Sequence, residues 1–379
     1  MSDFFEASLA LHRAHGGKLE VRPTVPLETR ADLSLAYTPG VAAVSEAIAK
    51  DKALAYAYTI KRNAVAVVTD GSAVLGLGNL GPAAALPVME GKAALFKRFA
   101  GVDAFPLCLD TQDPDEIVAT VRRIAPAFGG VNLEDISAPR CFEIERRLRG
   151  LLDIPVMHDD QHGTATVVLA ALLNALRVKA MPLADARAVV SGAGAAGHAV
   201  ALMLRTAGLA DVTVCDRGGV VSPGRADLNE EKRALSAWTN PRGVRGTLAD
   251  AVRGADLFIG VSAPGLLTAD MVRSMRPQPI VFALANPRPE IMPDEARAAG
   301  ALVVATGRSD FPNQVNNVLA FPGLFRGALD HGVKQFEPRH FAQAARRLAA
   351  CVPAPTAERI LPDPFDPQVV PAVAGSVAE

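Results

Sequence analysis

Two acidic pairs, each directly after a short apolar run, are well suited to bind a cation. Glu134 and Asp135 follow Gly-Gly-Val-Asn-Leu, and Asp159 and Asp160 follow Ile-Pro-Val-Met-His. Four carboxylates at the ends of two buried strands are costly to remove from water unless a cation or another partner offsets their charge. Hard oxygen ligands of this kind suit Mg²⁺ or Mn²⁺. The pattern therefore predicts a divalent-metal site where the two strands end.

Two histidines flank the second acidic pair. His158 and His162 are four residues apart, a spacing that on a helix can bind zinc. We expect the strand to run to about Met157 and the next helix to begin only near Gly163. The two histidines are then not on one helical face, which argues against zinc.

Lys92 and Tyr37 are candidates for proton transfer. Lys92 stands among Ala93, Ala94 and Leu95 in a helix expected over 82–100. A lysine in apolar surroundings near a cation should lose basicity, as a catalytic base requires, although a lysine whose head group reaches solvent is the plainer alternative. Tyr37, one of three tyrosines, precedes a Thr-Pro-Gly turn, and the burial habits of aromatic residues alone favour a packed side chain there.

A glycine-rich motif at 192–197 predicts dinucleotide binding. It reads G-x-G-x-x-G, follows a strand expected at 186–191, precedes a helix expected at 198–207, and lies upstream of a strand that ends in an acid. The glycines let the backbone approach a pyrophosphate, whose charge the helix N-terminus stabilises. The residues expected to contact the dinucleotide are Gly192, Gly194, Ala195, Ala196, Gly197, Asp216 and Asn286.

The acid at the end of that strand bears on the choice of cofactor. Asp216 should accept hydrogen bonds from the ribose hydroxyls and repel a 2′-phosphate, which favours NAD, whereas Arg217 beside it could reverse the choice. A second G-x-G-x-x-G at 76–81 has no strand directly before it and no acid at the end of a second strand. We expect it to be a tight turn at a helix entry.

Asn286 and Asn317 are candidates for substrate contacts. Asn286 follows an apolar run expected to be a strand, and Asn317 lies soon after another such run. In Rossmann-type sheets these strand ends bind ligands. An isolated Asn-Pro is usually a turn, so only the position of Asn286 favours a binding role.

These residues require a scaffold of alternating strands and helices. Strands expected at 64–68, 105–110, 127–133 and 152–157 alternate with helices, as in an α/β fold. The chain of 379 residues exceeds one typical core. We predict two domains, residues 1–162 and residues 163–379, the second a Rossmann-type, doubly wound parallel sheet followed by C-terminal helices.

The composition excludes several other classes of protein. Net charge is −1 and aromatic residues make up 5% of the chain, so neither nucleic acid nor an anionic membrane is an expected partner. The four cysteines share no close spacing. The N-terminus lacks the features of a signal peptide, and the longest apolar run, 165–178, is interrupted and short for a bilayer span. A cytoplasmic protein is expected.

The motifs together resemble the malic enzyme family, specifically its short bacterial members. The resemblance covers nearly the whole chain, from Ala-Tyr-Thr-Pro-Gly at 36–40 to Asn-Asn-Val-Leu-Ala-Phe-Pro-Gly at 316–323, and rests most on 132–135 and 158–165. It implies two α/β domains and the oxidative decarboxylation of L-malate to pyruvate and CO₂, with reduction of NAD or NADP and a need for Mg²⁺ or Mn²⁺. Decarboxylation of oxaloacetate and a homodimer, or a dimer-based oligomer, are further expectations.

The resemblance also implies roles for individual residues. It makes Glu134, Asp135 and Asp160 the metal ligands. Lys92 becomes the base that takes the C2 hydroxyl proton, oriented by Asp159, and Tyr37 the acid that protonates the enolpyruvate carbon. Asn286 and Asn317 hold substrate oxygens. Burial and a nearby dication should lower the pKa of Lys92 while Asp159 raises it, so a compromise is expected.

The chain departs from the family pattern in one place. Larger members have an arginine shortly after Thr-Asp-Gly that grips the substrate, whereas Ser-Ala-Val stands here at 72–74. No phosphotransacetylase-like extension is expected beyond residue 379. A metal-independent dehydrogenase of hydroxy or amino acids, and a non-catalytic dinucleotide sensor, remain as alternatives. The first would not need Glu134, Asp135 and Asp160, and intact Tyr37 and Lys92 argue against the second.

Overall fold

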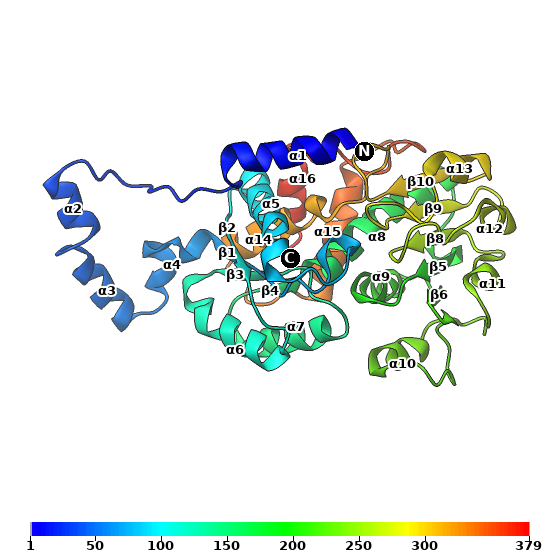
Figure 1. Cartoon of the computed structure of the whole chain (residues 1–379), viewed down its shortest axis with the longest axis horizontal. Coiled ribbons are helices and arrows are strands. Elements are labelled where there is room, and N and C mark those ends of the chain that lie inside the picture. Colours follow the sequence, from blue (N-terminus) through cyan, green and yellow to red (C-terminus); the bar gives the residue numbers. More distant parts are fainter. Residues whose placement is uncertain (1, 379) are drawn as a thin grey trace.

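The computed structural model describes residues 2–378, which form two parallel sheets surrounded by helices, with a helical segment projecting at one end (Figure 1). The first part of the chain contains α1 (Ser2–His15), α2 (Arg30–Ala36), α3 (Val41–Lys50), α4 (Leu54–Tyr58), β1 (Ala64–Thr69), α5 (Pro82–Ala100), β2 (Asp103–Cys108), α6 (Pro114–Ile124), β3 (Gly130–Leu133), α7 (Arg140–Leu151), β4 (Val156–His158) and α8 (Asp159–Lys179).

The second part of the chain contains β5 (Arg187–Ser191), α9 (Ala195–Thr206), β6 (Asp211–Asp216), β7 (Gly219–Val220), α10 (Glu230–Ser236), α11 (Leu248–Val252), β8 (Leu257–Gly260), α12 (Ala269–Ser274), β9 (Ile280–Ala283), α13 (Pro293–Ala298), β10 (Val303–Thr306), α14 (Phe321–Asp330), α15 (Pro338–Ala350) and α16 (Val369–Ala374). The α/β fold predicted from the sequence is confirmed.

The first sheet brings the two acidic pairs to one edge. Its strands are parallel and run in the order β2-β1-β3-β4. Every residue of β1, which reads Ala-Val-Ala-Val-Val-Thr, is buried, as expected of a parallel strand covered on both faces. Because Leu133 at the end of β3 pairs in register with His158 at the end of β4, the residues that follow both strands meet.

The second sheet has the order β10-β9-β8-β5-β6-β7, parallel except for the short edge strand β7. The glycine-rich turn joins β5 to α9 in its middle. The helix begins at Ala195 rather than at the expected residue 198, so the last glycine of the motif lies inside the first turn of α9. The other G-x-G-x-x-G, at 76–81, leads into a helix as expected, since Gly81 directly precedes α5, whose first residue is Pro82.

Helix α8 connects the two sheets. It begins at Asp159, four residues before the predicted start, and packs against α9 of the second sheet and α15 near the C-terminus. The C-terminal helices return to the first half, where Phe321 and Phe325 of α14 contact the ring of Phe96 in α5 edge to face. The division predicted between residues 162 and 163 falls in the first turn of α8 and stays a prediction.

Residues 19–60, here called the arm, leave the body of the protein after α1. Helices α2 and α3 lie far from both sheets (Figure 1). None of α2, α3 and α4 contains a buried residue. The arm is anchored at its start by Lys18, whose Nζ donates to the carbonyl of Pro87, and just after its end by Lys61, whose Nζ donates to that of Phe128.

Within the described residues, no helix combines the length and the apolar content needed to cross a bilayer.

Candidate active site

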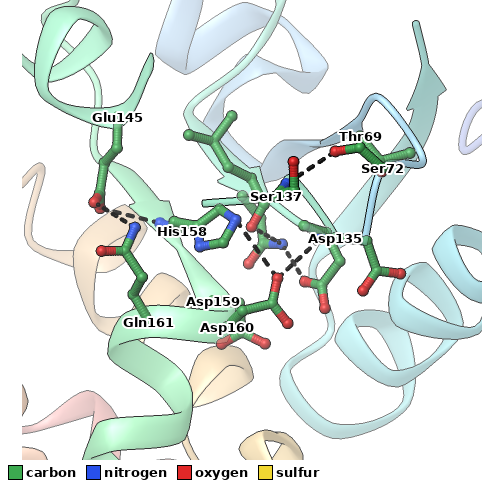
Figure 2. Close-up of polar contacts among 12 residues, drawn as sticks. Thr69, Ser72, Asp135, Ser137, Glu145, His158, Asp159, Asp160 and Gln161 are labelled. Carbon is green, nitrogen blue, oxygen red and sulfur yellow. Dashed lines mark hydrogen bonds and ion pairs between the residues drawn. The ribbon is translucent and has the colours of Figure 1, made fainter. Parts of the chain in front are cut away.

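The predicted metal ligands come together where β3 and β4 end. One oxygen from each of Glu134, Asp135 and Asp160 can be chosen so that all lie within 4.8 Å of one another. The backbone N–H of Asp135 donates to Oδ2 of Asp160 over 2.8 Å, which links the two acidic pairs directly (Figure 2). Oδ2 of Asp135 is buried without a hydrogen-bond partner.

These three carboxyl groups disfavour one another's charged form. Burial raises the pKa of Asp135 to about 9, and the neighbouring Asp160 and Glu134 add to the shift. Burial likewise raises the pKa of Glu134 to about 7 and that of Asp160 to about 6. Crowded oxygen ligands with an unpartnered carboxylate oxygen fit a hard divalent cation such as Mg²⁺ or Mn²⁺.

Hydrogen bonds from the Thr-Asp-Gly-Ser turn fix the backbone at Asp135. The N–H of Ala73 donates to the carbonyl of Asp135 over 2.9 Å, and the N–H of Ser137 donates to Oγ of Ser72 over 2.9 Å. Asp135 itself has φ +53°, a left-handed conformation uncommon for a non-glycine residue. Ser72, where the larger family members were expected to differ, therefore ties this turn to the acidic segment.

Lys92 is buried beside the acidic group. Its Nζ lies 2.6 Å from Oδ2 of Asp159, 3.0 Å from Oε1 of Glu134 and 4.1 Å from the centre of the Phe321 ring. Burial opposes the charged form, but Asp159 and Glu134 outweigh it and raise the pKa of Lys92 above its usual range. The compromise expected with a dication nearby stays a prediction, because this shift belongs to the chain's own residues, in which two carboxylates contact the ammonium group.

The absence of a side chain at Gly163 leaves room for the Asp159 carboxylate against the first turn of α8. A Cβ at that position would lie 1.8 Å from Oδ1 of Asp159 and 3.3 Å from Cβ of Asn317. Burial raises the pKa of Asp159 to about 7. Asn317 and the Asp159 carboxylate, which contacts Lys92, thus both lie beside Gly163.

The histidines do not join the metal group. His158 precedes α8, is fully buried, and has a pKa that burial lowers to about 4, so its ring is neutral. Its Nε2 lies 3.5 Å from Oδ2 of Asp160 (Figure 2). His162 lies inside α8, pairs with Glu145 at 2.9 Å and stacks on Phe341.

Glu145 is a buried residue that the sequence interpretation missed. The helix containing it, α7, is rich in Arg and Glu, a composition typical of a solvated helix face. In the structure the Glu145 carboxylate accepts the backbone N–H of His158 at 3.0 Å and contacts Gln161 and His162. The apolar neighbours Ile144 and Leu148 are the signal in the sequence that one face of α7 is buried.

Tyr37 is not brought to Lys92 within the chain. It follows α2 in the arm, and 67% of its surface is exposed. Helix α2 lies at the far end of the arm, away from β3 and β4 (Figure 1). One chain therefore assembles the acidic residues and the lysine, but not the tyrosine.

The glycine-rich turn opens onto a cavity of about 1470 Å³. Gly192 and Gly194 line this cavity, and Ala195, Ala196 and Gly197 form the first turn of α9 behind it. A Cβ on Gly197 would lie 1.8 Å from the carbonyl oxygen of Gly192, so the turn can pack this closely only with glycine. At Gly194, by contrast, a Cβ would meet nothing within 4 Å, which leaves room for a phosphate.

Asp216 lines the same cavity, but its oxygens already have partners. Oδ1 accepts from Arg225 at 2.8 Å and from the N–H of Gly218 at 2.9 Å, and Oδ2 accepts from Lys232 at 2.6 Å. Although burial opposes ionisation, these donors lower the pKa of Asp216 below its ordinary value. Arg217 also lines the cavity.

Asn286 lies close to the loop that follows Thr-Asp-Gly, not among the residues that line this cavity. Its carbonyl oxygen would be 2.8 Å from a Cβ on Gly76, and its amide nitrogen would be 2.8 Å from a Cβ on Gly307. Asn286 thus lies between the loop that follows β1 of the first sheet and the end of β10 of the second sheet.

The fold and the site define a two-domain α/β protein with a Rossmann-type second half and an acidic group at the edge of the first sheet. The sequence matches the description "Malic enzyme, N-terminal domain" over residues 16–149 and "Malic enzyme, NAD binding domain" over residues 161–366. The chain belongs to the malic enzyme family, as the sequence motifs predicted.

Relatives match this chain over nearly its whole length. The "Bifunctional malic/malolactic enzyme" of Bacillus subtilis is 53% identical over 99% of this chain and 92% of its own. The "NAD-dependent malic enzyme" of Geobacillus stearothermophilus is 54% identical over 96% of this chain and 76% of its own. The crystal structure of a Thermotoga maritima NAD-dependent malic enzyme aligns with a TM-score of 0.94 and 47% identity, covering 97% and 98% of the two chains. Curated relatives named NADP-dependent also match.

Proposed function

We propose that this protein catalyses the divalent-metal-dependent oxidative decarboxylation of L-malate to pyruvate and CO₂, with reduction of NAD or NADP. The observation that carries the proposal is the contact of buried Lys92 with both Asp159 and Glu134. It places Lys92 beside the acidic metal group, where a bound dication would offset the two carboxylates and lower the pKa of Lys92 toward that of a proton acceptor. Membership of the malic enzyme family supports the same conclusion.

In the proposed reaction Glu134, Asp135 and Asp160 hold Mg²⁺ or Mn²⁺. When bound, the ion would act as a Lewis acid toward the C2 oxygen and favour the charge that develops there. Lys92, kept in place by Asp159, takes the proton of the C2 hydroxyl while the C2 hydride passes to the nicotinamide. Asn317, beside Gly163, and Asn286 are the proposed contacts for substrate oxygens.

Loss of CO₂ from the resulting 2-keto acid leaves its electron pair on C3, which must then gain a proton. Tyr37 is the proposed donor of that proton, giving pyruvate. Added oxaloacetate would enter at this second stage and be decarboxylated by the same residues. The proposed location is the cytoplasm.

The exposed position of Tyr37 supports a homodimer in which the arm of one protomer supplies the site of the other. Helices of 7, 10 and 5 residues are too short to be stable alone in water. They carry exposed apolar side chains, among them Leu35, at 77% exposed, and Tyr58. A second copy covering this surface would stabilise the arm, and a two-fold axis would give each site one tyrosine.

A complementary apolar surface lies next to the acidic group. Leu75, Leu77 and Leu80, all exposed, project from the loop that follows Thr-Asp-Gly. The backbone N–H of Leu75 lies 3.5 Å from Oδ1 of Asp135, so a segment packed on this loop would reach the proposed metal site. The partner's arm is the proposed segment.

The proposal is tested by malate turnover with Mn²⁺ and each cofactor, with the product identified as pyruvate. EDTA should abolish NADH or NADPH formation, and added Mn²⁺ should restore it, because the carboxylates need the ion to act on the substrate oxygen. A stoichiometric pyruvate yield distinguishes this reaction from simple dehydrogenation. Unimpaired turnover in EDTA would instead favour a metal-independent dehydrogenase.

A further inference from the structure

Glu290 is a buried carboxylic acid that the proposed reaction does not use. It lies between β9 and α13 in the chain and is fully buried. A carboxylate in such a place is costly to remove from water unless donors or a cation offset its charge. Burial raises the pKa of Glu290 above its ordinary value, and the hydrogen bonds that it accepts oppose the shift. Those hydrogen bonds show what the carboxylate holds.

The two oxygens of Glu290 bind two different loops. Oε1 accepts the backbone N–H of Ser262 over 2.9 Å and the hydroxyl of the same residue over 3.3 Å. Oε2 accepts the backbone N–H of Ala285 over 3.1 Å. Ser262 comes two residues after β8, and Ala285 comes two residues after β9. One rigid, planar carboxylate thus fixes the loop after β8 relative to the loop after β9.

The local sequence makes room for this carboxylate. Gly260 is the last residue of β8, and a Cβ there would overlap the carboxylate carbon and both oxygens of Glu290. The carbonyl of Glu290 also accepts the N–H of Leu267 over 3.1 Å, which ties its backbone to the segment after β8. Side chain and main chain of Glu290 therefore serve the same connection.

The loop after β8 faces the dinucleotide cavity. Ser262 and Ser191 both line that cavity, and their hydroxyl oxygens are 3.0 Å apart. Because an ionised carboxylate only accepts hydrogen bonds, the Ser262 hydroxyl donates to Glu290 and is left to accept from Ser191. These strand ends are where Rossmann-type sheets bind ligands, so this loop is on the cofactor side.

The loop after β9 carries Asn286, a proposed contact for substrate oxygens. Asn286 follows Ala285 directly, and its carbonyl oxygen would be 2.8 Å from a Cβ on Gly76. The N–H of Leu75, the residue before Gly76, lies 3.5 Å from Oδ1 of Asp135. The loop after β9 therefore reaches the first sheet next to its acidic group, on the substrate side.

We propose that Glu290 is a positioning residue that sets the distance between the nicotinamide ring and the malate carbon that gives up the hydride. It does so by holding the cofactor-side loop at Ser262 and the substrate-side loop at Ala285 on one carboxylate. Hydride transfer needs the reacting atoms about 3–3.5 Å apart, and a misplacement of about 1 Å can cost roughly a hundredfold in rate. The inference rests on the proposed function, because it concerns the geometry of that reaction.

Glu290→Gln tests this role, because it keeps the shape of the side chain but replaces one oxygen by an NH₂ group. The remaining oxygen can keep both donors of Ser262, which leaves the NH₂ group facing the N–H of Ala285. The substrate-side loop should then move while the cofactor-side loop stays. With malate and Mn²⁺, kcat should fall about a hundredfold. The affinity for the reduced cofactor, measured by its fluorescence without malate or metal, should change less than about threefold.

Malate deuterated at C2 separates positioning from a general loss of stability. In Glu290→Gln hydride transfer should limit the rate more fully, so the isotope effect on kcat should rise. A merely structural role would lower Tm and the fraction of active protein, but would leave the isotope effect and KM of the active fraction unchanged. Glu290→Asp keeps the charge but is one methylene too short to reach both loops, and it should act in the same direction.

Glu295→Gln is the matched control, because it makes the same chemical change at an exposed residue of α13. It should leave kcat, the isotope effect and cofactor affinity unchanged.

The possible failures are distinguishable. If Glu290→Gln folds with an unchanged kcat and isotope effect, or loses cofactor affinity by the same factor as kcat, the inference is overturned and the proposed function stands. If neither Glu290 variant folds, the carboxylate serves the core alone and the inference is likewise overturned. If the unaltered protein does not oxidise malate, the proposed function fails, and the inference fails with it.

Discussion

The acidic site and the arm differ in how completely a single chain builds them. Lys92, Asp159 and Glu134 are almost fully buried and contact one another within one protomer. Tyr37, proposed for the same reaction, lies between α2 and α3, two helices without a buried residue. The difference shows that residue types and motifs can identify the residues of a site. They do not show whether each residue comes from the same protomer or from a partner protomer.

The largest expected effect on activity comes from a substitution in the buried acidic site. Lys92→Ala should lower kcat for malate oxidation by about 10³-fold, because it removes the proposed general base. Binding of the cofactor, measured by calorimetry, should persist, since the cavity at the glycine-rich turn is separate. Lys97→Ala is the control: Lys97 lies on the same helix, but 62% of its side chain is exposed. Unchanged turnover in Lys92→Ala would remove Lys92 from the mechanism.

Mixing two inactive variants tests whether the site is shared between chains. Lys92→Ala and Tyr37→Phe should each turn over malate weakly. After unfolding and refolding together in equal amounts, half of the dimers should be mixed, and each should have one intact site of two. Recovery of about a quarter of the original activity is therefore expected for a symmetric dimer with exchanged arms. If each chain supplied its own tyrosine, no activity would return.

Removing an apolar side chain from the arm should weaken association. Leu35→Ser should raise the dissociation constant of the dimer about a hundredfold or more, because each buried leucine contributes about 1.5–3 kcal/mol and a homodimer loses two of them. Sedimentation velocity across a concentration series measures this shift, and activity should fall with dilution. Leu151→Ser, at an exposed leucine on α7 outside the arm, should change neither. An unaltered dimer in Leu35→Ser would indicate another interface.

The smallest expected effect is a pH dependence of the folded protein's stability, caused by the carboxyl groups of the acidic site. Asp135, Glu134 and Asp160 have raised pKa values in the folded chain, of about 9, 7 and 6. The folded state therefore binds more protons than the unfolded state between about pH 4 and pH 9. In EDTA its stability should fall as pH rises through that window, by a few degrees in Tm. Because Mn²⁺ competes with those protons, it should raise Tm more at pH 8.5 than at pH 6.

Much of the fold and of the acidic site could be predicted from the sequence. Apolar runs that end in polar residues mark parallel strands, and parallel order alone brings their ends to one edge. For this reason the four carboxylates of the two acidic pairs could be grouped in advance, whereas the separation of Asp159 from the three proposed metal ligands came from the resemblance to the family. Lys92 could be selected from its apolar neighbours and its motif.

Other features depend on contacts that sequence patterns do not reveal. The start of α8 was placed too late because Asp-Asp-Gln-His-Gly is polar and ends in glycine, yet carboxylates are favourable at a helix N-terminus. Glu145 was hidden by the charged residues around it. The pairing of Asp216 with Lys232 joins residues 16 positions apart through a loop whose path could not be derived.

The continuity of α8 has a consequence for motion. Its 21 residues form a rod about 30 Å long, with Asp159 and Asp160 at one end and the packing against α9 along its length. A hinge between the two sheets cannot lie inside this rod without breaking its hydrogen bonds. A tilt of about 5° at its other end, where Lys179 contacts Asp256 just before β8, would instead sweep these carboxylates through roughly 3 Å. A movement of the second sheet would then be transmitted to the acidic group, with α8 as the lever.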